Sequence, residues 1–231
     1  MSMDFYLESL WRAAQLLSRL DPEIRDIAMR SVRISASATL LAAGVGVPLG
    51  ACVALAQFRG KKALVTTLST LMGLPTVIVG LLLYGLLSRQ GSLGALGLLF
   101  TPSAIIVAEW LLSLPIITRL TIAAVEAVDP RVHATALTLG ASRLQAYLKV
   151  LGEARAAVAA AVVTGFGRAI SEVGAAMIVG GNIRGVTRTL TTAVALETSK
   201  GNFSFALALG LILLSIFFVL NLLFLRLLEA R

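Results

Sequence analysis

Two ionisable residues, Arg168 and Glu172, lie four positions apart inside a stretch that is otherwise uncharged, Ala156 to Gly181. Residues four apart share one face of a helix, so the guanidinium and the carboxylate can pair. An ionisable residue within a membrane span normally faces a bundle interior or a water path. The pair therefore has two interpretations. It fixes helix packing, or Arg168 lends positive potential to a route for anions while Glu172 holds Arg168 in place or links helices as they move.

Other reactive residue types are scarce. Cys52 is the only cysteine, which excludes an intrachain disulfide and a metal site built on cysteine pairs. His133 is the only histidine, and it is interpreted as a solvated or interface residue because no second ligand lies nearby. The sequence contains no Gly-x-x-x-x-Gly-Lys loop, so we expect this chain to bind no nucleotide, cofactor or metal itself. Any energy source would come from a partner or an ion gradient.

The elements that must position these residues are hydrophobic helices. Hydrophobic residues make up 58% of the chain, charged residues 14%, and the mean hydropathy is +0.91, values outside the range of soluble domains. Three uncharged stretches exceed the roughly 20 residues that cross a bilayer: they lie between Arg33 and Arg59, Lys62 and Arg89, and Lys200 and Arg226. Two further spans are predicted, Pro102 to Leu120 with Glu109, and Ala156 to Gly181. We expect an all-α polytopic membrane bundle of about five transmembrane helices.

Residues 1–30 are predicted to form an N-terminal amphipathic segment, separate from a membrane domain at 31–231. Its apolar stripe comprises Phe5, Leu7, Leu10, Trp11, Ala14 and Leu17. This pattern suits a helix lying in the membrane interface, and an ordinary packing helix is an equal alternative. The segment lacks the features of a signal peptide, so we expect the mature chain to keep it.

Orientation is not settled by the number of basic residues, which divide almost evenly between the two sides. The cluster Arg59, Lys61 and Lys62 in the short first loop favours a cytoplasmic location for that loop. The same arrangement places residues 126–155 and the C-terminus in the cytoplasm and the N-terminus outside. Arg184, Arg188 and Lys200 would then lie outside, which suits a transported anion.

A polar, basic island at 126–155 interrupts the hydrophobic pattern. Pro130 indicates a helix start, Gly140 a bend and Ser142 the N-cap of a second short helix. Two short helices joined at a glycine form a protruding apolar knob, flanked by Arg143 and Lys149. This shape favours docking into a groove of another protein, and an ordinary loop is the alternative.

The island resembles the cytoplasmic coupling loop of ABC importer permeases, whose pattern is Glu-Ala-Ala, three residues, Gly, nine residues, Ile, one residue, Leu-Pro. Ala134, Thr135 and Ala136 stand at the first triplet, Gly140 at the Gly and Val150 at the Ile, while Gly152 and Glu153 replace Leu-Pro. Ala134 also replaces the family's Glu, so no salt bridge to the ATPase is expected from it. By resemblance the residues that seat in the ATPase are Ala134, Thr135, Ala136, Leu137, Leu139, Gly140, Ala141, Ser142 and Arg143.

The second half of the chain is similar to the molybdate, tungstate and sulfate permeases, and most like their tungstate branch. The matching runs are Gly-Phe-Gly-Arg-Ala-Ile-Ser-Glu-Val-Gly-Ala from residue 165, Val-Gly-Gly-Asn-Ile-Arg-Gly from 179, Thr-Arg-Thr-Leu-Thr-Thr from 187 and Ala-Leu-Glu-Thr-Ser-Lys-Gly from 195. The Ile-Arg-Gly and Leu-Glu-Thr-Ser-Lys-Gly pieces favour tungstate.

This resemblance assigns a substrate pathway. Residues 181–201 would form its outer mouth, where arginine and hydroxyl groups donate to a tetrahedral dianion. Arg184 and Arg188 have an alternative role as salt-bridge partners of an external binding protein. Glu109 is expected to cap a polar patch near Arg168. The pathway candidates are Arg168, Glu172, Gly174, Asn182, Arg184, Arg188 and Thr191.

The resemblance also implies the assembly: a homodimer in the cell membrane of a prokaryote, with two cytoplasmic ATPase subunits that bind ATP and Mg, and an extracytoplasmic oxyanion-binding protein. The chain would be a permease without catalytic residues, working by alternating access at the homodimer axis. Molybdate and sulfate remain alternative substrates. A gradient-driven carrier, with Glu172 or Glu109 as its proton site, and a membrane scaffold that only recruits a protein are the other classes left open.

Overall fold

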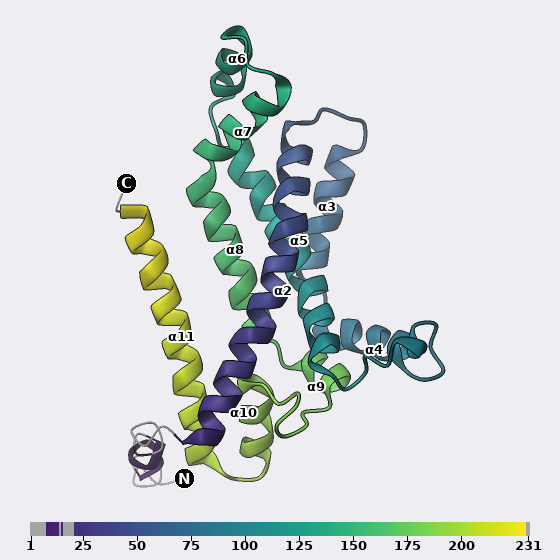
Figure 1. The fold of residues 1–231 in the computed structure, drawn as a ribbon, viewed down its shortest axis with the longest axis vertical. Coiled ribbons are helices and arrows are strands. Elements are labelled where there is room, and N and C mark those ends of the chain that lie inside the picture. The colour runs from purple at the N-terminus through teal and green to yellow at the C-terminus, as the bar shows by residue number, and fades with distance from the viewer. Residues whose placement is uncertain (1–7, 14, 16–20, 230–231) are drawn as a thin grey trace.

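The computed structural model describes residues 8–13, 15 and 21–229, and these form helices joined by loops. Three helices run along the long axis: α2 (Pro22–Leu55), α5 (Pro102–Glu126) and α11 (Phe203–Glu229) (Figure 1). Each contains a stretch long and apolar enough to cross a membrane, and two bent helix pairs bring the number of possible spans to five. The predicted all-α membrane bundle is therefore confirmed.

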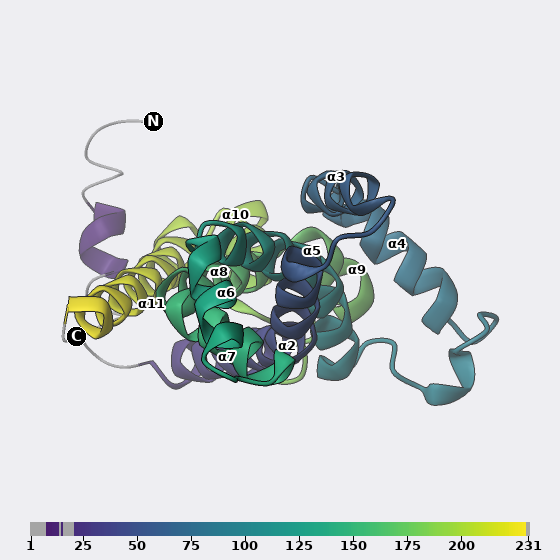
Figure 2. The same cartoon turned by 90° about the horizontal axis from the view of Figure 1, so that it is seen from above.

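One bent pair consists of α3 (Lys61–Met72) and α4 (Thr76–Leu87), which meet at 93°. The span predicted between Lys62 and Arg89 consists of two helices of 12 residues each, about 18 Å long at 1.5 Å per residue. Pro75 explains the bend, because the residue before a proline is driven out of the helical region. In Figures 1 and 2, α4 leaves the bundle sideways.

The other bent pair consists of α7 (Arg143–Glu153) and α8 (Arg155–Ile170), which meet at 68°. The prediction of one helix from Ala156 to Gly181 is wrong, because α8 ends at Ile170 and a short helix, α9 (Gly174–Gly180), follows after a three-residue break. Ser171 terminates α8 with a hydroxyl that donates back to the carbonyl of Gly167 at 2.8 Å. The remaining short elements are η1 (Gly94–Leu96), α6 (Pro130–Thr138) and α10 (Leu190–Ser199).

The helix α2 begins earlier than its uncharged stretch. Asp21 caps it with a carboxylate that accepts from the backbone N–H of Glu23 at 2.8 Å, and Pro22 occupies the first helical position, where a missing N–H has no cost. The boundary expected at residue 30 consequently lies inside α2. Of the N-terminal stripe, the structure describes Leu10 and Trp11, which are both exposed on a helical turn. The other four residues of the stripe lie outside the described residues.

Glycines allow α2 and α5 to pack closely along each other. A Cβ atom at Gly50 would lie 2.7 Å from the carbonyl oxygen of Thr118, and one at Gly46 would lie 3.0 Å from the Thr118 hydroxyl. A side chain at either position would force the helices apart. Gly46 and Gly50 thus serve close helix packing, and small residues are typical of such interfaces in membranes.

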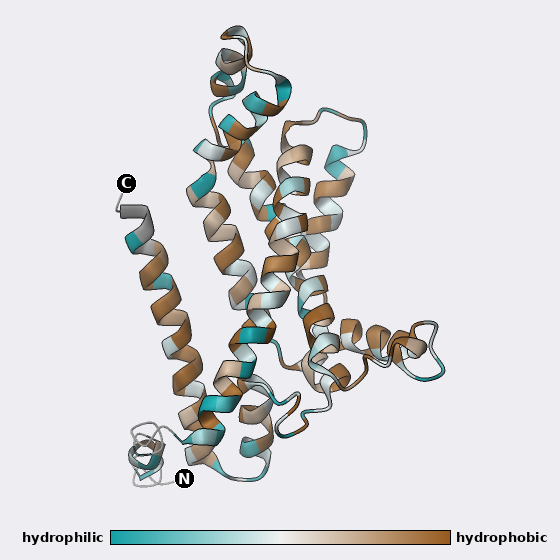
Figure 3. Cartoon of the chain, viewed as in Figure 1, coloured by the Kyte–Doolittle hydropathy of each residue, from teal (hydrophilic) through white to brown (hydrophobic). Residues whose placement is uncertain are grey.

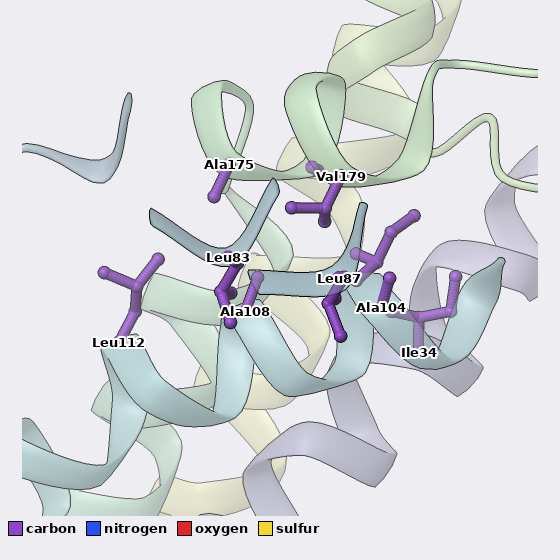
Figure 4. Packing of buried hydrophobic residues seen from close by; sticks show 10 residues of the cluster. Ile34, Leu83, Leu87, Ala104, Ala108, Leu112, Ala175 and Val179 are labelled. Atoms are coloured by element: carbon purple, nitrogen blue, oxygen red, sulfur yellow. The ribbon is translucent and has the colours of Figure 1, made fainter. Parts of the chain in front are cut away.

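A core cluster joins α2, α4, α5 and α9 near the lower part of Figure 1. Figure 4 shows Leu83 and Leu87 of α4 packed between α5 and α9, with Val179 on the α9 side and Leu112 on the α5 side. This contact holds the sideways helix α4 against the bundle. Figure 3 shows that hydrophobic residues dominate α4 and α11, whereas polar residues gather at the start of α2 and on α6 and α7.

The loops divide between two ends of the molecule. The α2–α3 loop and the α6–α7 segment lie at one end, and α11 runs toward that end (Figure 1). The start of α2, α9 and α10 lie at the other end. The relative placement predicted for the first loop, the polar island and the C-terminal helix is therefore confirmed.

Candidate functional site

The polar island folds as two short helices joined by a tight turn. The Asp129 carboxylate caps α6 by accepting from the backbone N–H of Arg131 at 2.8 Å, and Pro130 is the first helical residue. After α6 ends, Gly140 adopts φ of +87°, the left-handed conformation that glycine adopts without a steric penalty. The predicted helix start and bend are both confirmed.

A capping box begins the second helix. The Ser142 hydroxyl accepts from the backbone N–H of Gln145 at 3.3 Å, and the Gln145 side chain accepts from the backbone N–H of Ser142 at 2.8 Å. The predicted N-cap is thus confirmed. At the far end of α7, Lys149 pairs with Glu153 at 2.8 Å. The hydrogen bond and charge of Lys149 hold the pKa of Glu153 below its ordinary value, so Glu153 is ionised at neutral pH.

The tip of this segment is apolar and exposed. Leu139 is 82% exposed, and Leu144 and Leu148 of α7 are more than half exposed. A cavity of about 540 Å³ lies between α6 and α7, lined by Thr135, Ala136 and Ala141 among others. Of the nine predicted docking residues, seven are exposed, and Ala136 and Ala141 are partly buried. An apolar tip with a polar rim is the form that protein interfaces take.

The base of the segment is tied to the membrane helices. Val150 of α7 is buried in a cluster with Ala51 at the end of α2 and Val125 at the end of α5. The Tyr147 hydroxyl donates to the carbonyl of Pro48 in α2 at 3.1 Å. These contacts connect α7 to the ends of α2 and α5. The sequence analysis missed Tyr147, although a tyrosine on an amphipathic helix beside a buried face was a usable signal.

The ionisable pair lies at the break that ends α8. The Arg168 guanidinium donates to one carboxylate oxygen of Glu172 at 2.8 Å, and the other oxygen accepts from the backbone N–H of Ala175 in α9 at 2.9 Å. Glu172 is 2% exposed, whereas the Arg168 side chain is 29% exposed. The predicted pairing is confirmed. Glu172 therefore links the last turn of α8 to the first turn of α9.

Two further pathway candidates contact this region. The Thr191 hydroxyl, in α10, donates to the backbone carbonyl of Glu172 at 2.6 Å. Gly174 lies against α4, where a Cβ atom would come within 2.8 Å of the Thr76 hydroxyl. The break between α8 and α9 is thus a junction at which α4 and α10 also meet.

Glu109 of α5 lies in the same region. It is 2% exposed, hydrogen-bonds Ser35 of α2, and is close enough to Arg168 and Glu172 to interact with both charges. Its second carboxyl oxygen has no hydrogen-bond partner in the described part of the chain. The expectation that Glu109 lies near Arg168 is confirmed, and Ser35 is a member that the sequence analysis missed.

The other candidates form a separate group in the loop between α9 and α10. Arg184 pairs with Glu23 of α2 at 2.5 Å, and Arg188 lies 3.7 Å from the second oxygen of the same carboxylate. Asn182 has a positive φ of 49°, and its amide donates to the carbonyl of Thr192 at 3.2 Å. Arg184 and Arg188 are therefore bound within the chain.

The loop is also held from α2 by a second contact. Arg30 donates to the carbonyls of Gly185 and Arg188 at 3.0 and 3.2 Å. Neither Glu23 nor Arg30 was a sequence candidate, because more than 150 residues separate them from their partners. Across the described ranges, no group of three or more His, Cys, Asp or Glu residues is arranged to hold a metal ion.

The comparison with known families shows to which protein family this chain belongs. Residues 46–231 match the family described as binding-protein-dependent transport system inner membrane component. The chain belongs to this family. It is therefore an inner membrane transport component and not an enzyme, and membership implies association with ATPase subunits and a substrate-binding protein.

Individual relatives of this inner membrane component cover most of its length. It is 43% identical over 219 residues to the tungstate uptake system permease protein TupB of Peptoclostridium acidaminophilum, covering 95% of this chain and 96% of that protein. TupB of Campylobacter jejuni is 36% identical, with 95% and 92% covered. The molybdenum transport system permease protein ModB of Escherichia coli K12 is 30% identical over 182 residues, with 75% and 79% covered.

A solved structure shares the fold of this inner membrane component. The crystal structure of an amino acid ABC transporter with histidines superposes with a TM-score of 0.56 at 20% sequence identity, covering 93% of this chain and 94% of that one. At this identity the likeness concerns the arrangement of helices alone.

Proposed function

We propose that this chain is the membrane-spanning subunit of an ATP-driven importer whose substrate is tungstate. The observation that carries the proposal is the 43% identity to a tungstate uptake permease along 95% of the chain. Permeases named for molybdenum are less similar, at 27% to 30% identity over about three quarters of the chain.

The proposed ATPase contact is the 126–155 segment, on the cytoplasmic side of the membrane. Leu139 and its neighbours on the turn would enter a cleft of the ATPase, since no described residue of this chain covers their exposed apolar area. ATP and Mg would be bound by that partner. The N-terminus and the α9–α10 loop would then face outward, toward an extracytoplasmic oxyanion-binding protein.

The proposed mechanism is alternating access in a homodimer with the substrate route along its twofold axis. ATP binding would draw the two 126–155 segments together. Because Val150 and Tyr147 join α7 to the ends of α2 and α5, this movement would rotate those helices. ATP hydrolysis would reset them.

The proposed role of the buried charges is to shape the route electrostatically while holding the α8–α9 junction. Arg168 remains partly exposed, so part of its positive potential can reach a passing anion, whereas Glu172 is fixed by Ala175. Arg184 and Arg188 would present a positive surface at the outer mouth while their bonds to Glu23 keep the loop folded.

The test is ATP hydrolysis by the chain reconstituted in liposomes with its ATPase and binding protein, with tungstate, molybdate or sulfate added separately. We expect tungstate to stimulate hydrolysis at the lowest concentration. If molybdate or sulfate stimulates hydrolysis at a lower concentration than tungstate does, that anion is the substrate instead of tungstate. A complex that assembles but responds to none of the three would remove the oxyanion assignment.

The buried Glu109 favours one alternative, a gradient-driven carrier. Its carboxyl has one oxygen without a partner and lies among helices that would move, as a proton site requires. Uptake that stops with an uncoupler but continues without the ATPase would establish this alternative.

A further inference from the structure

A pocket opens at the end of the molecule opposite the 126–155 segment. Its volume is about 700 Å³, and it lies between the start of α2, the start of α5 and the α9–α10 loop. Arg25, Arg30 and Arg33 of α2 line it, together with Asp26. None of these four residues belongs to the pathway or coupling groups described above.

The pocket carries an excess of positive charge. Three guanidinium groups face one carboxylate, which leaves two positive charges uncompensated among the lining side chains. Arg25 and Arg33 are exposed, and the side chain of neither has a hydrogen-bond or ion-pair partner among the residues that the structure describes. Guanidinium groups bind the oxygens of phosphate-like anions bidentately, so two unpaired arginines in one pocket favour such a group.

One wall of the pocket is fixed before any ligand arrives. Arg30 bonds the carbonyls of Gly185 and Arg188, and Val186, which lies between them, lines the pocket. The loop that closes one side is thereby held against α2. A preformed site loses less conformational entropy on binding than one that must be ordered.

Part of the pocket lining is apolar. Met29 and Ile34 of α2, Ile106 of α5 and Val186 of the loop contribute hydrophobic side chains. A free, fully hydrated dianion gains nothing from such a surface. A lipid presents apolar groups directly beside its phosphate, so the combination of arginines and apolar residues matches a lipid better than a free ion.

The pocket also lies at the depth of a lipid headgroup. Arg33 is the last charged residue before the uncharged stretch 34–58. The helical part of this stretch, 34–55, is about 33 Å long and thus slightly exceeds the roughly 30 Å of hydrocarbon. Leu40 and Leu41, two turns further along α2, are 70% and 56% exposed, as side chains that face acyl chains would be.

We propose that this pocket binds a tetrahedral oxyanion group, and that this group is the phosphate of an anionic phospholipid. Arg25 and Arg33 contact the phosphate oxygens, and Met29, Ile34 and Ile106 contact the adjoining glycerol and the upper acyl carbons. The bound lipid fills the gap between α2, α5 and the α9–α10 loop at the membrane surface. The site is independent of which anion the protein transports.

The test is native mass spectrometry of the assembled complex titrated with phosphatidylglycerol or with phosphatidylcholine of the same chain length. We expect the wild type to bind phosphatidylglycerol in preference to phosphatidylcholine. The double variant Arg25→Gln/Arg33→Gln should lose about tenfold or more in phosphatidylglycerol affinity, since each basic residue near a membrane surface attracts anionic lipid appreciably. Arg89→Gln, at an exposed arginine outside the pocket, should behave as wild type.

A second variant guards against a folding defect. Val186 is 44% exposed, so Val186→Glu adds a carboxylate to the pocket without burying it. This variant should lose the same affinity for phosphatidylglycerol, and its thermal unfolding should be unchanged. Unchanged lipid preference in both variants would overturn the site. Displacement of phosphatidylglycerol by millimolar inorganic phosphate or tungstate, with loss of both ligands in Arg25→Gln/Arg33→Gln, would assign the pocket to a free oxyanion and overturn the lipid assignment.

Discussion

Arg168 and Glu172 bond at 2.8 Å across the end of α8, so their ion pair spans a helix break and not a helix face. Glu172 also accepts from the first turn of α9 and, through its backbone carbonyl, from Thr191 of α10. Three helices thus depend on one buried residue. A pair placed at such a junction restrains how α8, α9 and α10 move relative to one another.

Arg168→Ala should destabilise the protein and reduce transport, because it leaves the Glu172 carboxylate buried without its cation. Breaking a buried pair from one side typically costs about 3 kcal/mol or more. The double variant Arg168→Ala/Glu172→Gln should recover part of the lost stability, since no uncompensated charge remains. Thermal unfolding in detergent and tungstate-stimulated ATP hydrolysis measure the two effects. If Arg168→Ala transports tungstate at the wild-type rate, the pair serves helix packing and has no role in transport.

Leu139→Glu should abolish co-purification with the ATPase and leave the chain's own stability unchanged. Leu139 is 82% exposed, so the folded chain loses no contact, whereas a charge in an apolar cleft of a partner is strongly unfavourable. Leu96→Glu, at a 61% exposed leucine of η1, outside the 126–155 segment, is the matched control. An ATPase complex that survives Leu139→Glu would contradict the docking assignment.

Gly140→Glu should weaken ATPase association through the backbone as well as through charge. A Cβ atom at Gly140 meets no other atom within 4 Å, so the chain has room for a side chain, but φ of +87° disfavours any L-residue by about 1 kcal/mol. Gly140→Asn, which tolerates this conformation better, should retain more binding. If both variants co-purify with the ATPase as well as the wild type does, the turn is not part of the interface.

Tyr147→Phe should leave the ATPase bound but impair its stimulation by substrate. The change removes only the hydroxyl that bonds the Pro48 carbonyl, worth about 1 kcal/mol, and keeps the ring. Tyr84→Phe, in α4, controls for loss of a hydroxyl in general. If basal and substrate-stimulated ATP hydrolysis remain as in the wild type, this contact does not transmit movement from α7 to α2.

Glu109→Gln should preserve ATP-driven transport, because the amide has the shape of the carboxyl and retains an acceptor for Ser35. The measurement is uptake into liposomes with and without an uncoupler. In a gradient-driven carrier the same variant would lose uptake while the complex stayed assembled. That outcome would favour the alternative function over the proposed one.

Local signals in the sequence predicted local structure well. Pro130, Gly140 and Ser142 each act within one turn of helix, and the segment between α5 and α8 folds as they indicate. The break after α8 was missed because Arg168 and Glu172 have helical spacing, and a residue just past a helix end can keep that spacing. Gly73 and Pro75 are the local signals for the α3–α4 bend, whereas the absence of charge indicates only that the stretch is apolar enough for a span.

Contacts between distant segments were beyond prediction. Arg184 and Glu23 are 161 residues apart, and Tyr147 and Pro48 are 99 apart. Only the packing of α2 against α5 and α8 brings such partners together, and a single sequence contains no signal for it. The arginines and the asparagine predicted as anion donors in the 181–201 segment were therefore not recognised as already bonded within the chain.

Cys52 is exposed, and its sulfur lies 3.6 Å from the Tyr147 hydroxyl. Because it is the only cysteine in the chain, a thiol-reactive fluorophore would attach at a single position without any prior substitution. That position lies where α2 contacts α7. The native protein therefore carries a built-in attachment point for a fluorophore. Changes in its emission would report movement of α7 relative to α2 during each turnover.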